Sequence, residues 1–445
     1  MRSDAGSGRE AAPSYGAVWA LAWPIILANS SVPLLGMVDT AVVGHLPETH
    51  LIGAVAVGAM VFSWLYWGFG FLRMGTGGLT AQAVGAREPD EIRAVLGRAL
   101  LLSAVFGAAL IAIQVPAIDL ALYLVGASPE VAGSAREYFL IRIWSAPAAL
   151  AVYCLIGWFI GMQNTRITLM IQLFMNGLNI VLDLIFVWVF EWGVAGVAWA
   201  TLVAEVAAAV LALGLAARAM GRLGGRWHWG GVLHRARMRR MLLVNSDIFV
   251  RTLLLVFVFS YFTTLGARFG DLTLAANAVL MHLLSLQAFG LDGFAHAAEA
   301  LVGKAIGARD RHSLRPAVAV SFQMALTVAG LYAVFTLLFG EAVVAMLTNQ
   351  ADVRAFAADY LIWLTVSPLV AVWAFQLDGI FIGATQTREL RNGAILSVAV
   401  FLSLVWWLPD MFGNHGLWLA LTVWLGARGL TLALFYPRIA VAAAA

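Results

Sequence analysis

The sequence has a single cysteine and few charged residues. Cys154 stands alone among 445 residues, which excludes an internal disulfide bond and any metal site built from several cysteines. Charged residues make up 11% of the chain and hydrophobic residues 62%, whereas roughly a quarter of an ordinary soluble domain is charged. No GxxxxGKS or GxxxxGKT loop for nucleotide phosphates occurs, and no HExxH motif. These absences argue against a soluble domain, an ATPase and a metalloprotease.

Apolar stretches of helix length recur from Tyr15 to Pro437. Each is long enough for the hydrocarbon layer of a membrane, which is about 30 Å thick. They predict an all-α integral membrane protein with twelve transmembrane helices, at 15–43, 51–74, 94–115, 118–126 with 134–158, 167–190, 194–217, 240–265, 272–300, 316–340, 356–383, 392–412 and 415–436.

The sequence repeats itself at an offset of 222 residues. AVGAR at Ala83–Arg87 returns as AIGAR at Ala305–Arg309, and FIG at Phe159–Gly161 returns at Phe381–Gly383. One offset without a gap indicates a duplicated unit. Because six spans return the chain to its starting side, we expect two six-helix lobes in a parallel repeat. The predicted organisation is a polar N-terminal tail at 1–14, a lobe at 15–217, a basic linker at 218–239 and a lobe at 240–440.

Positive charges are concentrated in alternate loops. With the N-terminus inside, 20 of the 27 lysines and arginines fall in cytoplasmic segments, and seven of these lie between Arg218 and Arg240. This positive-inside bias supports an even number of spans, with both termini cytoplasmic, in the inner (plasma) membrane of a cell. The basic run is therefore interpreted as the linker between the lobes rather than as a nucleic-acid-binding segment.

Polar residues inside apolar helices mark a candidate site in the first copy. Asn176, Asn179 and Asp183 are spaced i, i+3 and i+7, so they share one helix face. Asp39, Asp183 and Thr201 are expected about 8, 12 and 10 Å from the outer ends of their helices, at 1.5 Å per residue. We therefore expect these groups at one level in the outer half of the first lobe. The second-copy equivalents of the three residues on the shared face are Val398, Phe401 and Val405.

The residue types of this candidate site limit what it can bind. An ionised aspartate at such depth costs at least about 2.5–3.5 kcal/mol, so Asp39 and Asp183 need protons, a cation or polar partners. Carboxylate, amide and hydroxyl oxygens suit Na⁺ or proton storage rather than zinc. A functional site is favoured, and a polar network that only holds helices together is the alternative. Glu205, one turn after Thr201, is a rival acid at greater depth.

A second polar group is predicted near the cytoplasmic side of the second copy. Asp247 and Arg251 are spaced i, i+4, which permits a pair, and Asp292 and Asp378 are also acids inside spans. We interpret these four as a charge-compensated cluster that braces the inner side, because an arginine can neutralise the acids. Direct ion coupling is the alternative.

Two further patterns are interpreted as packing. His296 and Glu299 have the residue types of a proton relay, but a packing role at the cytoplasmic end is favoured. The aromatic run from Phe62 to Phe71 could contact apolar cations. Packing between helices or against lipid is favoured there as well, since aromatic residues lie on all faces of that helix.

Several long motifs resemble one family of membrane transporters. The sequences at Met37–Leu46, Ser63–Arg87 and Asn176–Asp183 are similar to those of multidrug and toxic compound extrusion transporters. Those at Leu291–Arg309 and Leu377–Asn392 are similar to the DinF-type branch in particular. The resemblance covers nearly the whole chain. It implies a twelve-helix, two-lobed exporter that exchanges an inward-moving ion for an outward-moving substrate.

The resemblance also implies site residues and partners. The cation site of the family corresponds to Asp39, Asn179, Asp183 and Thr201, which would be metal ligands if Na⁺ is the coupling ion. A first-helix proline, a candidate hinge, corresponds to Pro24, and a neighbouring tyrosine to Tyr138. H⁺ is favoured over Na⁺, because two neighbouring carboxylates can share protons. The expected substrates are small amphipathic or cationic organic compounds. The protein is expected to act as a monomer among membrane lipids, without a cofactor.

Other classes of protein remain as alternatives. A lipid-linked oligosaccharide flippase of the same superfamily would carry a basic cavity for a pyrophosphate, and the deep arginines are few: Arg73, Arg142, Arg251 and Arg428. An ion channel is disfavoured by the single asymmetric cluster. A membrane enzyme is disfavoured because no convincing pair of nucleophile and base is present. The sequence therefore favours a secondary active exporter.

Overall fold

The computed structural model describes residues 13–44 and 49–442, and within these ranges it is helical throughout apart from short connections. The side chains at 33–37, 39–41, 43–44, 49–50 and 440–442 lie outside the description. The described part of the first lobe and the linker contains α1 (Tyr15–Gly44), α2 (Thr49–Gly68), α3 (Phe71–Gly85), α4 (Pro89–Ala112), α5 (Gln114–Val125), α6 (Pro129–Arg142), α7 (Ala146–Gly161), α8 (Thr165–Asp183), α9 (Gly193–Leu223) and α10 (Trp229–Val232).

The second lobe follows the same order of spans. Its described helices are α11 (Arg235–Ala267), α12 (Asp271–Gly307), α13 (Arg311–Leu347), α14 (Ala351–Ala358), α15 (Leu361–Gly383), α16 (Thr387–Val405), α17 (Leu408–Phe435) and α18 (Pro437–Ala442). The segment predicted as a linker, 218–239, is mostly helical, because α9 continues to Leu223 and α11 already begins at Arg235.

The spans match the prediction with one local difference. Eleven segments of the described chain are long and apolar enough to cross a membrane by length and composition. The twelfth is α16, whose charged first residues lower its hydropathy but whose 19 residues extend about 28 Å. The stretch 118–126 is not part of the fourth span: α5 is a separate short helix, which ends where Gly126 adopts a left-handed conformation. The predicted two-lobed, twelve-helix membrane fold is confirmed.

The duplication is visible in the backbone. Left-handed residues occur in pairs separated by the repeat offset of 222: Arg87 and Arg309 at φ 56° and 54°, Gln163 and Thr385 at 59° and 52°, and Glu191 and Gly413 at 54° and 57°. Five of these six residues are not glycine, and left-handed conformations are uncommon for residues with a Cβ. The two copies therefore kept the same strained turns while their side chains diverged.

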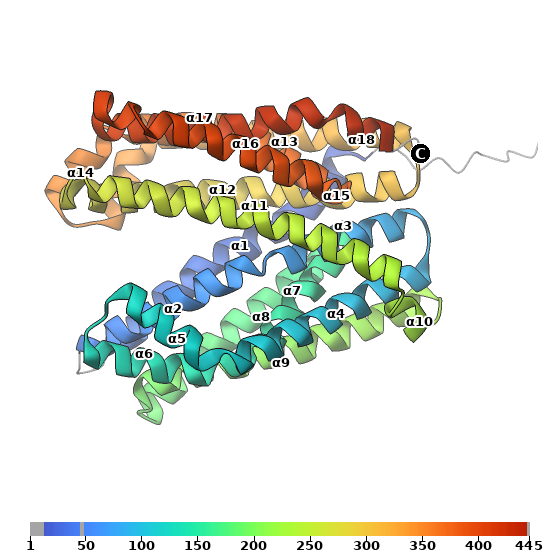
Figure 1. Ribbon diagram of the computed structural model, residues 1–445, viewed down its shortest axis with the longest axis horizontal. Helices are drawn as coiled ribbons and strands as arrows, with labels where there is room; N and C mark the ends of the chain where they lie inside the picture. Colours follow the sequence, from blue (N-terminus) through green and yellow to red (C-terminus); the bar gives the residue numbers. More distant parts are fainter. Residues whose placement is uncertain (1–12, 45–48, 443–445) are drawn as a thin grey trace, which may run out of the picture.

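The two lobes touch through α3 and α12. A Cβ atom at Gly85 would overlap the carbonyl oxygen of Lys304, and one at Gly307 would overlap the carbonyl oxygen of Gln82. Gly85 and Gly307 are equivalent positions of the repeat, so each lobe supplies the same glycine to the contact. In Figure 1 the helices of the two lobes converge at the end that holds α10 and diverge toward α6 and α14.

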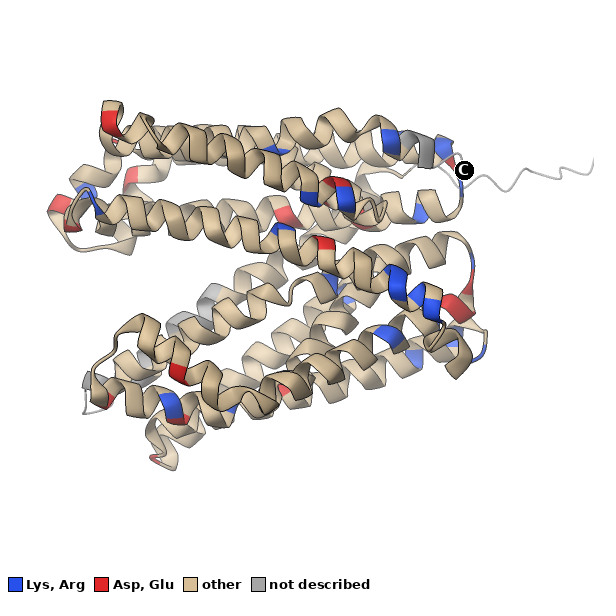
Figure 2. Cartoon of the chain, in the orientation of Figure 1, with Lys and Arg blue, Asp and Glu red and all other residues tan. Residues whose placement is uncertain are grey.

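Charge is distributed unevenly along the bundle. Figure 2 shows that the lysines and arginines gather at the end where the two lobes converge and where α18 lies, which we call the basic end. There the linker is held against α4, since Arg93 Nη2 donates to the carbonyl oxygen of Met220 at 2.6 Å and Arg98 Nη1 donates to that of Gly231 at 2.8 Å. The charged residues inside the spans are mostly paired with one another, as an apolar membrane layer requires.

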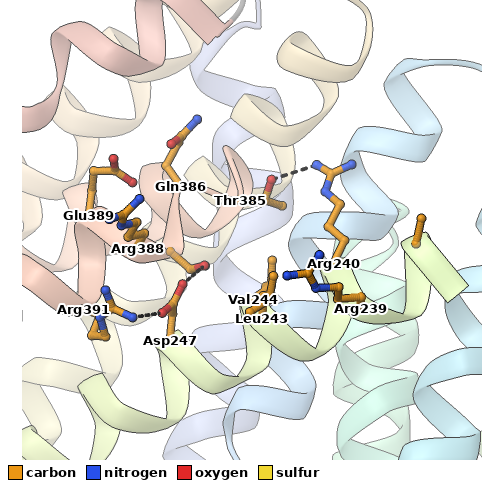
Figure 3. Close-up of a pocket in the computed structure, with 12 residues that line it drawn as sticks. Arg239, Arg240, Leu243, Val244, Asp247, Thr385, Gln386, Arg388, Glu389 and Arg391 are labelled. Carbon is orange, nitrogen blue, oxygen red and sulfur yellow. Dashed lines mark hydrogen bonds and ion pairs between the residues drawn. The ribbon is translucent and has the colours of Figure 1, made fainter.

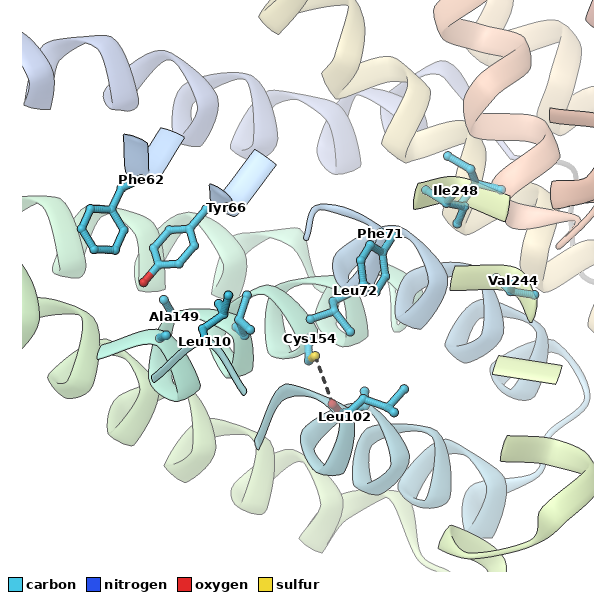
Figure 4. Close-up of a cluster of buried hydrophobic side chains, with 14 of the residues drawn as sticks. Phe62, Tyr66, Phe71, Leu72, Leu102, Leu110, Ala149, Cys154, Val244 and Ile248 are labelled. Carbon is cyan, nitrogen blue, oxygen red and sulfur yellow. Dashed lines mark hydrogen bonds between the residues drawn. The ribbon is translucent and has the colours of Figure 1, made fainter. Parts of the chain in front are cut away.

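The core of the first lobe continues into the second lobe near the basic end. Phe71 and Leu72 of α3 belong to the same buried cluster as Val244 and Ile248 of α11 (Figure 4). Cys154 lies fully buried in this cluster and donates its thiol to the carbonyl oxygen of Ala99 at 3.4 Å. Because lipid tails are as apolar as these side chains, close packing rather than exclusion of water stabilises such contacts in a membrane.

Replacement of Trp418 by alanine is expected to lower the free energy of unfolding by about 3–5 kcal/mol. The indole is fully buried, meets the ring of Phe262 edge to face at 5.1 Å between centroids, and donates to Asn277 Oδ1 at 2.9 Å. Unfolding by sodium dodecyl sulfate in mixed micelles measures the loss. The control is Trp406→Ala at a ring that is 85% exposed, where a change within about 0.5 kcal/mol is expected. Equal losses at both positions would contradict the prediction.

Candidate functional site

A cavity of about 330 Å³ lies inside the first lobe, among α1, α2, α6, α7, α8 and α9. Pockets for drug-sized molecules occupy roughly 300–1,000 Å³, so the volume is sufficient for a small organic molecule. Part of its lining is aromatic, with Phe62, Tyr66 and Trp67. The polar part of its lining includes Asn176, Asn179, Thr201, Arg142 and Glu205.

The two asparagines of α8 are fixed by neighbouring helices. Asn176 Nδ2 donates to Ser31 Oγ of α1 at 2.8 Å, and Asn179 Nδ2 donates to Thr201 Oγ1 of α9 at 3.3 Å. Thr201 in turn donates to the carbonyl oxygen of Val197 at 3.0 Å. The Oδ1 atoms of both asparagines are buried and accept no hydrogen bond from the described residues. Two positioned amide oxygens are thus left as acceptors for a cation or a protonated group.

Asp183 lies one helical turn beyond Asn179 on the same face of α8 and is fully buried. It is not among the residues that border the cavity. Immediately after Asp183 the helix widens into a π-helix at Leu184–Val189, an irregularity that is frequent at functional sites. The structure therefore combines a buried carboxylate with a local break in helix geometry.

Of the two site residues predicted on α1, the structure describes the side chain of Pro24 but not that of Asp39. Asp39 lies on α1, but its side chain is outside the described residues, so its place in the cation site stays a prediction. Pro24 is buried within the continuous helix. Because proline has no N–H, the carbonyl oxygen of Ala20 loses its donor within the helix. The hydroxyl of Thr165 on α8 donates to this oxygen at 3.4 Å, so the proline position is tied to the helix that carries Asp183.

Glu205, the rival acid, lies at the cavity within an ion-pair network. Its carboxylate accepts hydrogen bonds from Ser145 Oγ and from Arg142 Nη2, the latter at 3.3 Å. Arg142 Nη1 donates to the hydroxyl of the buried Tyr138 at 2.8 Å, and its guanidinium carbon lies 4.5 Å from the centroid of the Phe62 ring. The charge of Glu205 is therefore neutralised by an arginine, and the predicted neighbour Tyr138 belongs to this network.

Sequence reasoning missed three members of the site. Ser31 and Ser145 were not singled out, and Arg142 was not connected with Glu205. A signal existed for the arginine, because a buried carboxylate on a membrane span requires a nearby cation and few arginines lie inside the spans. No comparable signal exists for the serines, since small hydroxyl residues are common in membrane helices.

The aromatic run of the second span is divided between two roles. Phe62, Tyr66 and Trp67 border the cavity, whereas Trp64 is 55% exposed on the outer surface. Phe71 packs against Phe106 edge to face, with centroids 5.9 Å apart. Part of the run therefore faces the cavity, and the rest packs between helices or faces outward, because successive positions on a helix point in different directions.

The predicted inner charge cluster is separated into different groups. Asp247 accepts from Arg391 Nη1 at 2.6 Å, so the i, i+4 pair with Arg251 that the spacing permits is not formed. Arg251 instead pairs with Asp378, which also accepts from Arg428 Nη2 at 2.6 Å. Side chains from α15, α16 and α17 supply these partners, and the spacing along α11 could not reveal them. A bracing role for the groups stays a prediction.

The remaining acid, Asp292, belongs to a group that bridges the lobes. Its carboxylate lies 3.5 Å from His296 Nε2, and His296 Nδ1 lies 2.9 Å from Glu299 Oε2. Arg73 of α3 approaches the same imidazole from the first lobe. The described buried charges of the second lobe thus lie at lobe contacts and in compensated groups, whereas in the first lobe polar residues, including the Arg142–Glu205 pair, line a cavity.

A pair of parallel six-helix lobes, with a polar cavity inside the membrane layer, is the architecture of a secondary transporter. The MatE family model matches residues 24–185 and 248–408, once in each lobe. The chain belongs to the MatE family, whose members are membrane transporters and not enzymes.

Individual relatives agree with this assignment. The chain is 44% identical over 422 residues to DNA damage-inducible protein F of Escherichia coli, which covers 95% of this chain and 92% of that protein. It is 21% identical over 409 residues to the multidrug export protein MepA of Staphylococcus aureus, with 92% of this chain and 90% of that protein covered. A solved outward-facing multidrug resistance MATE family transporter shares the fold, with a TM-score of 0.86, 20% identity and 96% of each chain covered.

Proposed function

We propose that the protein exports small organic compounds in exchange for a cation, by alternating access between two lobes in the plasma membrane. The observation that carries this proposal is the cavity of the first lobe, which joins an aromatic wall to positioned amide and hydroxyl oxygens beside the buried Asp183. The names of the multidrug relatives support an export direction. The positive-inside bias supports a cytoplasmic location for the basic end and for both termini.

The lining of the cavity indicates the class of substrate. Aromatic faces attract cations and flat apolar groups, and Phe62, Tyr66 and Trp67 provide three of them. Glu205 offers a carboxylate at the same cavity, although Arg142 already neutralises it. Amphipathic or weakly cationic organic molecules therefore fit better than inorganic ions or anions. We propose that a monomer suffices, because each element of this site comes from one lobe of one chain.

H⁺ is the coupling ion that we propose. A fully buried carboxylate in an apolar layer costs at least about 2.5–3.5 kcal/mol when ionised, so Asp183 gains from protonation. Asp39, at a similar predicted depth, would share protons with it. The free oxygens of Asn176 and Asn179 are also ligands that Na⁺ accepts, and Na⁺ is therefore the competing assignment. One charge moving across about 150 mV supplies about 3.5 kcal/mol, enough for a several-hundred-fold substrate gradient.

The flippase alternative finds little support at this cavity. A pyrophosphate headgroup requires several uncompensated arginines or lysines. Among the described residues that border the cavity, Arg142 is the single basic side chain, and it is paired with Glu205. The cavity of the first lobe therefore lacks the excess positive charge that a lipid-linked oligosaccharide would need.

Transport by purified protein in proteoliposomes tests the proposal. A pH gradient without sodium is expected to move a fluorescent organic cation such as ethidium toward the acidic side of the membrane. The cation leaves liposomes that are acidic outside and accumulates in liposomes that are acidic inside. Empty liposomes and a protonophore provide the controls. Flux that requires an imposed Na⁺ gradient at constant pH would assign Na⁺ instead, and absence of flux under both gradients would contradict the exchange mechanism.

Replacement of Glu205 by glutamine is expected to leave the coupling ion unchanged while raising the KM of a cationic substrate several-fold. The carboxylate borders the cavity but is paired with Arg142, so its loss changes the charge that a substrate meets rather than the buried proton site. Initial transport rates at several substrate concentrations and several pH gradients separate the two effects. If the variant transported at the same rate with and without a pH gradient, Glu205 rather than Asp183 would be the coupling carboxylate.

A further inference from the structure

A second cavity, of about 680 Å³, lies at the basic end of the second lobe and has no role in the proposed exchange. It is formed by the first turns of α11, the turn between α15 and α16, and the first turn of α16 (Figure 3). Four arginines line it, two from each helix: Arg239, Arg240, Arg388 and Arg391.

The arginines of this cavity exceed its acids. The carboxylate of Asp247 accepts hydrogen bonds from Arg391 Nη1 at 2.6 Å and from the hydroxyl of Thr387 at 3.1 Å. Glu389, the other acid, is buried and accepts from Arg438 Nη1 at 2.7 Å. Because both carboxylates are already paired, the cavity keeps an excess of positive charge.

Two of the four arginines have no acceptor within the part of the chain that the structure describes. Arg239 and Arg388 are exposed and form no hydrogen bond or ion pair there. Arg240 is held by neutral groups, since its Nη2 donates to Gln82 Oε1 at 2.8 Å and to Thr385 Oγ1 at 3.0 Å. Guanidinium groups that converge on a cavity with spare donors are suited to the oxygens of a phosphate.

The surroundings of the cavity are apolar on the membrane side. Leu243 lines the cavity and is 56% exposed. On α16, Ile395 and Leu396 are about half exposed and lie two turns beyond Arg388, further into the span. A ligand that contacts both the arginines and these apolar side chains needs an anionic phosphate with hydrocarbon attached to it. A membrane lipid has that structure, and a nucleotide does not.

The first copy lacks this arrangement. At the 222-residue offset, Arg388 keeps an arginine, Arg166, but the equivalents of Arg239, Arg240, Asp247 and Arg391 are the apolar residues Ala17, Val18, Ile25 and Leu169. The arginine cavity is therefore not a general requirement of the fold at this end, nor of the membrane boundary. Three of the four arginines of the cavity are therefore particular to the second copy.

We infer that this cavity binds the phosphate headgroup of an anionic phospholipid from the leaflet at the basic end, with the acyl chains along α11 and α16. Basic pockets between membrane helices on the cytoplasmic side are a known type of site for such headgroups. Arg239 and Arg388 contact the phosphate, and Arg240 adds positive charge beside it, whereas Arg391 is neutralised by Asp247. The orientation proposed above makes this leaflet the cytoplasmic one.

Binding of defined lipids to the purified full-length protein tests this inference. Native mass spectrometry measures the Kd of phosphatidylglycerol and of phosphatidylcholine with equal chains, in neutral detergent, and inorganic phosphate is added as competitor. The pocket variant carries Arg239→Gln and Arg388→Gln. The matched control carries Arg218→Gln and Arg222→Gln, two exposed arginines near the end of α9 that are outside the cavity.

The expected results follow from the loss of two phosphate-facing charges. The pocket variant is expected to bind phosphatidylglycerol about twenty-fold more weakly than the unaltered protein, with a much smaller loss for phosphatidylcholine, whose phosphate is offset by its choline. The control variant is expected to bind both lipids as the unaltered protein does. Equal binding of phosphatidylglycerol by the pocket variant, or an equal loss in the control variant, would overturn the inference. Displacement of the lipid by equimolar inorganic phosphate would overturn the assignment to a lipid. Both variants change exposed side chains, and unchanged thermal unfolding checks that they are folded.

Discussion

Replacement of Asp183 by asparagine is expected to reduce pH-driven export by about a hundred-fold or more while the protein stays folded. The amide has nearly the same shape as the carboxyl but neither carries nor releases a proton, so one coupled charge is lost from each cycle. In the proposed exchange, that charge is the source of the several-hundred-fold gradient estimated above. Initial rates in proteoliposomes under an imposed pH gradient measure the change, and thermal unfolding with size-exclusion chromatography checks the fold.

The control for this experiment is an exposed carboxylate. Asp410 lies in the first turn of α17 with its side chain exposed, and Asp410→Asn is expected to transport at the rate of the unaltered protein. Asp39→Asn is expected to match Asp183→Asn, because the proposal places both acids in one proton site. Normal pH-driven rates in Asp183→Asn would exclude this residue from coupling and leave the first-lobe network as a structural element.

Replacement of both Gly85 and Gly307 by valine is expected to stop transport and to open the basic end. Each new Cβ would overlap a carbonyl oxygen of the opposite helix, Lys304 in one case and Gln82 in the other. Backbone atoms cannot yield as a flexible side chain does, so α3 and α12 have to separate. Crowding of packed positions costs roughly 1–3 kcal/mol at each site. Hydrogen–deuterium exchange of the α3 and α12 amides is expected to rise strongly in the variant.

Two glycines with free space around them provide the matched control. A Cβ at Gly214 of α9 or at Gly330 of α13 would meet no atom within 4 Å. The double variant Gly214→Val and Gly330→Val therefore makes the same chemical change, once in each lobe, without touching a lobe contact. It is expected to keep normal transport and exchange. If both double variants lost transport equally, the effect would come from the valines themselves and not from separation of the lobes.

The fold could be predicted from the sequence because its signals are periodic and long. Twelve apolar stretches and one repeat offset determine two six-helix lobes, and membrane burial leaves the backbone few alternatives to helix. The error at 118–126 has a local cause: α5 is apolar enough for a span, but Gly126 and Pro129 separate it from α6. Apolar composition alone does not distinguish a short helix from half of a span.

The candidate site was predictable only along single helices. The i, i+3, i+7 spacing placed Asn176, Asn179 and Asp183 on one face, and the structure agrees with that geometry. Spacing along one helix does not predict which residues of other helices a side chain will contact. Arg251 has an acid four residues away at Asp247, yet it pairs with Asp378 of α15. Contacts between helices depend on their rotation and depth, which one sequence does not encode in its spacing.

The burial of Cys154 has a practical consequence. Its thiol is sealed within the first-lobe core and engaged with a backbone carbonyl. Maleimide and methanethiosulfonate reagents added to the folded protein will therefore find only the cysteines that an experimenter introduces. Spin labels or fluorophores can be placed in pairs across the two lobes without first removing the native residue. Distances that change during a transport cycle can thus be followed in a chain that differs from the natural one only at the labelled positions.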